Sequence, residues 1–294
     1  MTYDVLVIGG AGVDTTAYVP ALPLPYKDTY HVPPVVDRIG NTGAGVALGC
    51  AALGLRTRFA DLIGDDLQGQ LIVDRLRHLD FAWARAEAGT RRSVLMVGPD
   101  GRRTSLHDPR ATPGERLPRE LYQVPARHAH VSIMDFCRDV LPDLDGMTIS
   151  TDLHDWDGSA DYHKDFAYGA DLVFLSATAL DDPAAVMRSI LSEGRAHTVV
   201  CTRGADGCLV LTREGDLRTF PASPLPAAVA DSNGAGDAFV SGFLYGTLNG
   251  RPLEECVSYG SIAGAHACTS AGTHEAPITE DVMLARAAGH PSAR

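Results

Sequence analysis

Short apolar runs alternate with amphipathic stretches along most of the chain. Runs rich in Val, Ile and Leu with polar ends are typical of buried strands, and they occur at 3–9, 130–134, 147–152, 171–176 and 198–202. Helical patterns lie between them, at 42–53, 65–79, 183–193 and 237–249. Because strands that alternate with helices usually pair in parallel, this order predicts a three-layer α/β fold with a mainly parallel central sheet.

Two stretches depart from the alternation. Residues 15–38 are rich in Pro and Tyr, and residues 93–106 consist of two strand-forming halves around a turn. We expect both segments to form a small strand-built appendage to the main sheet. A further hairpin is predicted at 208–220.

Composition narrows the class of protein. The chain has 294 residues, 45% of them hydrophobic and 21% charged, which suits one large domain or two small ones. Acidic residues number 37 and Lys plus Arg 25, so the formal net charge is −12. Nucleic acids and anionic membranes are bound by positive surfaces, and neither is therefore an expected partner.

The cysteines and the start of the chain predict a cytoplasmic protein. No two cysteines form a C-x-x-C pair, so we expect no zinc ribbon or thioredoxin-like motif; the cysteines are Cys50, Cys137, Cys201, Cys208, Cys256 and Cys268. Most lie in apolar surroundings, which suits buried thiols in a reducing compartment. We see no signal peptide and no apolar run of about 18 residues, so no membrane span is expected.

Lysine usage limits how the protein can bind phosphate. The only lysines are Lys27 and Lys164, and neither lies in a glycine-rich loop. A GxxxxGK[ST] phosphate loop and the VAIK lysine of protein kinases are both absent from the sequence. Any phosphate must then be held by backbone amides, arginine or a metal ion.

Residues 230–246, ADSNGAGDAFVSGFLYG, carry the candidate chemistry. Small residues directly before a helix let the amides of Gly234, Ala235 and Gly236 point at a ligand, and the helix dipole adds positive potential. Such an anion hole suits the charge on a transferring phosphoryl group. Asp237 in the first turn can accept a proton from a substrate hydroxyl. Taken alone, the tetrapeptide also fits a plain helix cap.

The motifs resemble those of one family in order and spacing. Residues 231–237 fit the pattern D-[ST]-x-G-A-G-D, which is the second signature of the ribokinase-like (PfkB) carbohydrate kinases. The family's other motifs are resembled at 9–14, 40–47, 64–69, 202–207 and 263–272. The resemblance covers nearly the whole chain. It implies a single ribokinase-like domain, with a small β-sheet lid inserted at about 13–38 and 88–110 and the substrate between lid and sheet.

The resemblance implies an ATP-dependent kinase of a hydroxymethyl group. The acceptor would be a sugar or sugar acid, or alternatively a nucleoside. Asp237 would be the base, and the amides of Gly234, Ala235 and Gly236 would form the anion hole. Mg²⁺ would accompany ATP, and carbonyls near 230–232 and 271–273 are a candidate site for a monovalent cation such as K⁺. Lids of this family often pair, so a homodimer through the lid is a further expectation.

Ligand contacts are carried over from the matching positions. Asp14 and Asn41 would bind hydroxyls of the acceptor, because carboxylate and amide groups suit polyols. Gly40 and Gly45 of the first signature are further candidates for this side of the site. Arg110 is a candidate for another reason, because it lies at the predicted lid, where an arginine could clamp a phosphate or carboxylate of the substrate. The candidates for the nucleotide side are Thr202, Gly204, Gly207, Ala263, His266, Ala267 and Gly272.

Some positions depart from the family pattern. In the first signature Asn41 replaces a glycine and Gly45 replaces an asparagine. The N-x-x-E that helps to organise Mg²⁺ is replaced at 176–179, where only Asp181 and Asp182 follow closely, so the metal ligands stay unassigned. These losses motivate an alternative, a ligand-binding homologue with weak catalysis. A second alternative is an oxidoreductase, since Gly9, Gly10 and Gly12 partly resemble a dinucleotide fingerprint.

Overall fold

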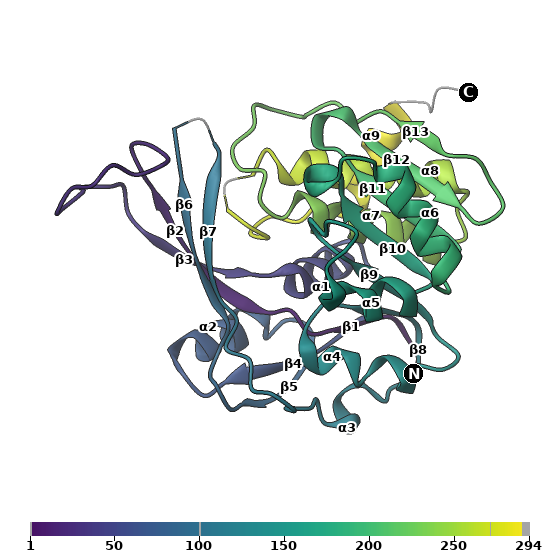
Figure 1. Ribbon diagram of the computed structural model, residues 1–294, viewed down its shortest axis with the longest axis horizontal. Coiled ribbons are helices and arrows are strands. Elements are labelled where there is room, and N and C mark those ends of the chain that lie inside the picture. The colour runs from purple at the N-terminus through teal and green to yellow at the C-terminus, as the bar shows by residue number, and fades with distance from the viewer. Residues whose placement is uncertain (1, 100, 271, 290–294) are drawn as a thin grey trace.

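Two sheets organise the molecule (Figure 1). The computed structural model describes residues 2–99, 101–270 and 272–289. A nine-stranded sheet has the order β13-β12-β11-β10-β9-β8-β1-β4-β5 and is parallel from β11 to β5. Its strands are β1 (Tyr3–Ile8), β4 (Thr57–Gly64), β5 (Asp80–Ala86), β8 (Ala126–Val131), β9 (Thr148–Asp152), β10 (Leu172–Ser176), β11 (Thr198–Thr202), β12 (Cys208–Thr212) and β13 (Arg218–Phe220). The expected three-layer α/β fold is confirmed.

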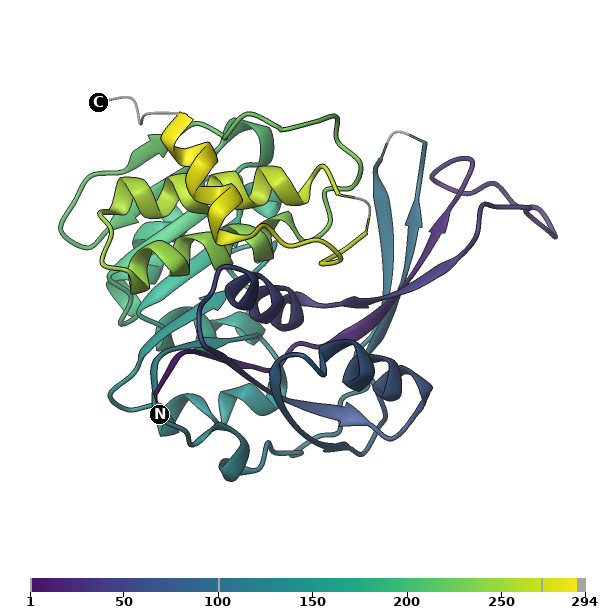
Figure 2. The same ribbon diagram turned by 180° about the vertical axis from the view of Figure 1, so that it is seen from behind.

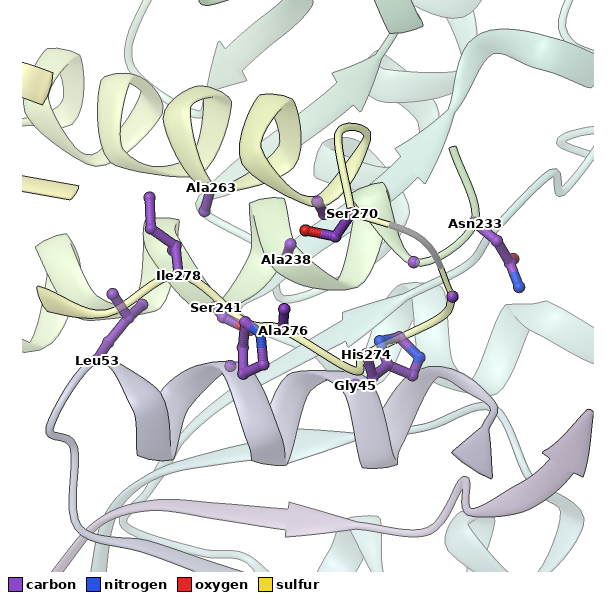
Figure 3. Close-up of a pocket in the computed structure, with 15 residues that line it drawn as sticks. Gly45, Leu53, Asn233, Ala238, Ser241, Ala263, Ser270, His274, Ala276 and Ile278 are labelled. Carbon is purple, nitrogen blue, oxygen red and sulfur yellow. The ribbon is translucent and has the colours of Figure 1, made fainter. Parts of the chain in front are cut away.

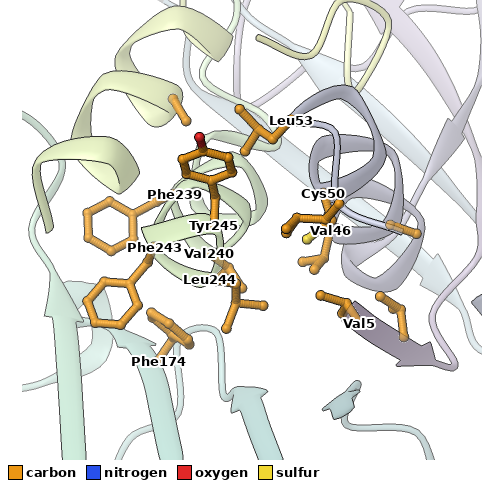
Figure 4. Close-up of a cluster of buried hydrophobic side chains, with 14 of the residues drawn as sticks. Val5, Val46, Cys50, Leu53, Phe174, Phe239, Val240, Phe243, Leu244 and Tyr245 are labelled. Atoms are coloured by element: carbon orange, nitrogen blue, oxygen red, sulfur yellow. The ribbon is translucent and has the colours of Figure 1, made fainter. Parts of the chain in front are cut away.

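Helices cover both faces of this sheet (Figures 1 and 2). One face packs against α1 (Thr42–Ala52), α2 (Leu67–Leu76), α7 (Ala235–Leu248), α8 (Leu253–Ala267) and α9 (Glu280–Gly289). The other packs against α3 (Arg119–Tyr122), α4 (Asp135–Arg138), α5 (Lys164–Gly169) and α6 (Pro183–Glu193). Figure 4 shows the first interface, where side chains of α1 and α7 meet Val5 and Phe174 of the sheet. No helix among the described residues is long and apolar enough to cross a membrane.

Glycine and alanine set the close approach of α1, α7 and α8. A Cβ at Gly49 would lie 2.3 Å from the Ser241 hydroxyl, and one at Gly242 would lie 2.5 Å from the backbone carbonyl of Tyr259. Larger residues at either position would collide with the neighbouring helix. This tight packing fixes α7, and hence the segment before it, relative to α1.

The second sheet is the appendage expected from the sequence. It has four strands in the order β3-β2-β6-β7, with β2 (Gly12–Tyr18) parallel to β6 (Arg92–Val97) and the other neighbours antiparallel. Its remaining strands are β3 (Val36–Gly40) and β7 (Arg103–Asp108). It projects from the main body beside the central sheet (Figure 1). We call it the lid sheet.

A buried ion pair anchors the lid sheet to the central sheet. Asp61 of β4 is fully buried, and its Oδ1 accepts a 2.6 Å hydrogen bond from Arg91 Nη2. The other carboxylate oxygen accepts from the amide of Ala11, while Arg91 Nε donates to the Ala11 carbonyl. Ala11 precedes β2 and Arg91 precedes β6, so this lid-root pair joins both lid strands to β4.

Several expected elements differ from the structure. A dinucleotide-binding fingerprint requires a helix after the glycine-rich turn. Here the chain passes from β1 through Gly9 and Gly10 into β2, so the alternative of a dinucleotide site at this turn is wrong. The strand expected at 130–134 is β8 at Ala126–Val131. The sequence did not indicate the start of this strand because polar histidines interrupt its apolar run. Both histidines, His128 and His130, are buried and form hydrogen bonds to the hydroxyl of Ser150 on β9. The hairpin at 208–220 is confirmed as β12 and β13.

Candidate active site

A cleft of about 1510 Å³ is lined both by the lid sheet and by the carboxyl ends of the central strands. Its lid side includes Asp14 of β2 and Arg103 and His107 of β7. Its floor includes Asp152 and Thr202, which end β9 and β11. Ligands of open α/β sheets bind at this edge, so the cleft is the candidate active site.

The segment before α7 is shaped for an anion. Gly234 precedes the helix with φ 79°, a left-handed conformation that glycine adopts without strain. The turn before it is fixed because the amide of Asn233 donates to Asp231 Oδ1 and its side chain donates to the hydroxyl of Thr273. Gly234, Ala235 and Gly236 all line the cleft. The N-terminus of α7 therefore borders the ligand space, and the amide of Ala235 also makes a long, 3.4 Å hydrogen bond to the carbonyl of Ser232.

Asp237 lies in the first turn of α7 and also lines the cleft. Burial raises the pKa of its carboxyl well above the usual range, and the nearby charges of Asp152 and Asp14 raise it further. Arg103 of the lid sheet opposes that rise. A carboxyl with a raised pKa is a stronger base once ionised, which is what proton abstraction from a hydroxyl requires.

Asp14 and Asn41 both line the cleft near the root of the lid sheet. Burial raises the pKa of Asp14 to about 6, against a lowering effect of Ser93 and Arg103. A Cβ at Gly40 would lie 2.1 Å from Asp14 Oδ2, so only glycine leaves room for this carboxyl. Asn41 Nδ2 is buried and has no hydrogen-bond partner among the described residues. An unsatisfied buried donor in a cleft is costly unless a ligand accepts from it.

Sequence reasoning missed His274. Its side chain is 6% exposed and its Nε2 lies 3.4 Å from Oδ2 of Asp237. It lines the cleft together with Asp14, Asn41 and Asp237. The only signal in the sequence was Gly45, the unexpected glycine of the first signature, because the ring of His274 occupies the space beside it.

Only some of the candidates for the nucleotide side line the cleft. Thr202, Gly204 and Gly207 line the cleft at the end of β11. From α8 and its end, the cleft is lined by Ser261, Gly264, Ala265 and Cys268. Ala263 and Ala267 instead line a separate 30 Å³ cavity against α1, with Gly45 and Gly272 (Figure 3). They are on the opposite side because each helical residue turns about 100° from the last.

The remaining candidates have partners within the protein. His266 is not among the residues that line either cavity, and its ring bonds to the backbone of Ala276. Arg110 lines the cleft on the lid side and donates to Asp108 Oδ2 at 2.7 Å. Where the family has N-x-x-E, Ser176 and Thr178 line the cleft and bond to each other. Asp182 caps α6 through the amide of Ala185, so its carboxylate stabilises a helix.

Comparison with known proteins identifies the family. Residues 163–280 match the pfkB family carbohydrate kinases. An acarbose 7(IV)-phosphotransferase of Actinoplanes sp. is 51% identical, with 97% of this chain and 98% of that protein aligned. The chain belongs to the pfkB family of carbohydrate kinases. It is accordingly an ATP-dependent kinase that phosphorylates a sugar hydroxyl.

Solved structures agree with this carbohydrate kinase assignment. A microbiome-derived acarbose kinase superposes with a TM-score of 0.90 at 43% identity, covering 98% of this chain and all of that one. A ribokinase of Arabidopsis thaliana, solved with ribose and ATP, gives a TM-score of 0.82 at 20% identity over 97% of this chain and 99% of its own. The second likeness shows the shared ribokinase-like fold.

Proposed function

We propose that this carbohydrate kinase transfers the γ-phosphoryl group of ATP to a hydroxymethyl group of acarbose or a similarly extended oligosaccharide. The observation that carries the proposal is that Asp237, the N-terminus of α7, Asp14 and Asn41 line one cleft. The similarity to an acarbose phosphotransferase over nearly the whole chain supports the acceptor. The cleft of about 1510 Å³ has room for ATP and the acceptor together, since residues of both sides line it.

In this proposal Asp237 takes the proton of the acceptor hydroxyl. The acceptor oxygen forms a bond to the γ-phosphorus, the bond from that phosphorus to the β,γ-bridging oxygen breaks, and ADP leaves with the electron pair. The amides of Gly234, Ala235 and Gly236 stabilise the charge on the transferring group. Asp14 and Asn41 orient the acceptor, with Gly40 leaving the space that Asp14 needs.

ATP in the same proposal lies along the floor of the cleft. Thr202, Gly204 and Gly207 flank it on one side and the cleft-facing residues of α8 on the other. Mg²⁺ would neutralise phosphate charge, held by the phosphates of ATP and water, as Mg²⁺ commonly is in kinases. Among the described residues no group of three or more His, Cys, Asp and Glu side chains is arranged to hold a metal ion. The lid sheet, with Arg110 at its base, would exclude water over the acceptor.

The role of Asp237 is tested by Asp237→Asn. The amide keeps the shape of the carboxyl but cannot accept the hydroxyl proton, so kcat should fall by roughly 10²–10⁴-fold. Binding of sugar and nucleotide, measured by calorimetry, should change little. Asp155→Asn is the matched control, because Asp155 is an exposed carboxyl at the same cleft. Retained activity in Asp237→Asn would contradict the proposed role.

The acceptor is tested by ADP release with acarbose, shorter sugars, sugar acids and nucleosides. We expect the highest kcat/KM with acarbose, because remote rings contribute binding energy to positioning. A nucleoside as the best acceptor would contradict the proposed substrate. Ligand binding without any ADP release would instead establish the weakly catalytic homologue that the missing N-x-x-E suggests.

A monovalent cation and a homodimer belong to the same proposal. The amides of Ala230 and Asp231 donate to the carbonyl of Cys268, which brings the segment before α7 to the end of α8, although Ala271 lies outside the described residues. Activity in K⁺ compared with activity in a bulky organic cation tests the cation site.

The homodimer would form through the lid sheet. Val94 and Leu106 are 41% and 56% exposed on the face of the lid sheet turned from the cleft. Light scattering would measure the mass in solution.

A further inference from the structure

His274 fills a space that two glycines leave open. It lies in the segment between α8 and α9, and its ring rests on α1 at Gly45 (Figure 3). A Cβ at Gly45 would lie 2.2 Å from Cε1 of the ring, and one at Gly234 would lie 2.7 Å from the same atom. The imidazole is therefore clasped between the start of α1 and the start of α7. Its backbone has φ 59°, a conformation that costs energy for a non-glycine residue.

The hydrogen bonding of the ring defines which nitrogen faces the cleft. His274 makes a hydrogen bond to the backbone of Asn41 that favours its protonated form, so the partner is a carbonyl and the ring donates. Nε2 has no hydrogen-bond partner among the described residues, which leaves Nδ1 as the donor. Burial lowers the pKa of His274 to about 4, so the ring is neutral near pH 7. Its Nε2 then carries a lone pair and no proton.

This lone pair faces the candidate base. Nε2 lies 3.4 Å from Oδ2 of Asp237, a long contact for a hydrogen bond. While Asp237 is ionised, both atoms are acceptors and no hydrogen bond joins them. Once Asp237 has taken the hydroxyl proton, its O–H can donate to Nε2. The bond is thus available to the protonated carboxyl and not to the carboxylate.

We propose that His274 is a positioning residue that strengthens Asp237 as a base by accepting a hydrogen bond from its protonated form. The inference rests on the proposed role of Asp237. The other groups that face Asp237 are Asp14 from β2, Asp152 from β9 and Arg103 from β7. The two carboxylates raise the pKa of Asp237, as the hydrogen bond to His274 would, whereas Arg103 lowers it. Gly45, where the family pattern has asparagine, is the residue that admits the imidazole.

Two variants remove the interaction in different ways. His274→Met replaces the ring by a flexible apolar chain with only a weak acceptor. Gly45→Ala keeps the imidazole but places a methyl group 2.2 Å from it, which must displace the ring. Ser270→Ala is the control, because Ser270 lines the same small cavity without lying near Asp237 in the cleft. Thermal unfolding shows which variants are folded.

The decisive measurement is kcat against pH at saturating sugar and ATP. Loss of the acceptor should move the acid limb to lower pH by about one unit, a tenfold loss of proton affinity, in both His274→Met and Gly45→Ala. The plateau kcat should fall by roughly tenfold, with the KM for ATP within about twofold of the wild type and Ser270→Ala unchanged. An acid limb that stays in place or moves to higher pH in the folded variants overturns the inference. Failure of the proposed function is separate, since it would appear as no sugar phosphorylation by the wild type or as activity in Asp237→Asn.

Discussion

Asn41 combines backbone strain with an unsatisfied side chain. Its φ of 68° and ψ of 153° belong to a region populated almost only by glycine, and glycine is what the family's first signature has there. A residue kept in such a conformation costs about 1–3 kcal/mol. The strained residue places a buried amide donor, Nδ2, which has no hydrogen-bond partner among the described residues, at the part of the cleft where the sugar would bind.

Asn41→Gly should separate stability from binding. Relief of strain should raise the free energy of unfolding by about 1 kcal/mol, while loss of the amide raises the KM for the sugar. Asn41→Ala is the matched variant, because it loses the amide but keeps the strained backbone. Denaturant unfolding and sugar kinetics of the pair provide the measurement. Equal stability of the two variants would show that the backbone at position 41 is not strained.

The sequence assigns candidate roles to residues within one motif more readily than to residues joined across the chain. Asp237, Gly234 and Asp14 stand in motifs whose order in the sequence indicated a phosphate site and a polyol site. His274 is brought to Asp237 only by the packing of α1, α7 and the segment before α9. No local pattern encodes that contact, and an isolated histidine in a sequence has no assigned partner.

At the scale of elements, the lid-root pair determines how the lid sheet is held. Both charges are buried, with side-chain exposures of 6% for Arg91 and 0% for Asp61. A buried ion pair stabilises the fold little more than a pair of apolar residues in its place would, but the loss of one partner leaves the other charge buried and uncompensated. The pair also supplies hydrogen bonds to the backbone of Ala11 and Leu62, so β2, β4 and β6 all depend on it.

Arg91→Met should destabilise the protein by about 3–5 kcal/mol, because it leaves the carboxylate of Asp61 buried without its partner. The control is Arg218→Met, which breaks a 2.7 Å pair with Glu254 in which both side chains are more than 40% exposed. That change should cost less than about 1 kcal/mol. Urea unfolding at pH 7 measures both. Equal losses in the two variants would show that burial of the lid-root pair has no energetic consequence.

Elements with regular apolar spacing were predicted well. The helix expected at 183–193 is α6 at Pro183–Glu193, with Asp182 as its cap. The strand β4 was missed because Arg58 and Asp61 interrupt its apolar run, although Asp61 is buried. A buried charge is compatible with a central strand only if a partner reaches it, and Arg91 comes from another sheet.

Across the whole molecule, buried histidines make stability depend on pH. Burial lowers the pKa to about 4 for His128, about 3 for His130 and about 4 for His274. Below an unfolded-state pKa of about 6.5 the unfolded chain binds more protons than the native protein, so acid destabilises the fold. As the pH falls from 7.5 to 5.5, each of these histidines should lower the free energy of unfolding by about 1.4 kcal/mol. Asp14, whose pKa is raised, acts in the opposite direction over the same range.

His128→Gln isolates one such contribution. The amide can still bond to Ser150 but does not titrate, so the variant should lose about 1.4 kcal/mol less stability than the wild type between pH 7.5 and 5.5. Urea unfolding at the two pH values gives the difference. An identical loss in wild type and variant would mean that His128 has the same pKa in the native protein as in the unfolded chain.

The place of β1 in the central sheet bears on how the protein reaches its fold. From β8 to β13 each strand lies beside the next one along the chain, so that half of the sheet can assemble from short-range contacts. β1 instead pairs with β4 and with β8, Val5 lying opposite His128. During synthesis the apolar β1 leaves the ribosome well before β8 exists. β1 can pair with β4 first, but completion of the sheet must wait for a contact of high sequence separation, which is slow, and until then the edge of β1 that pairs with β8 is open to aggregation.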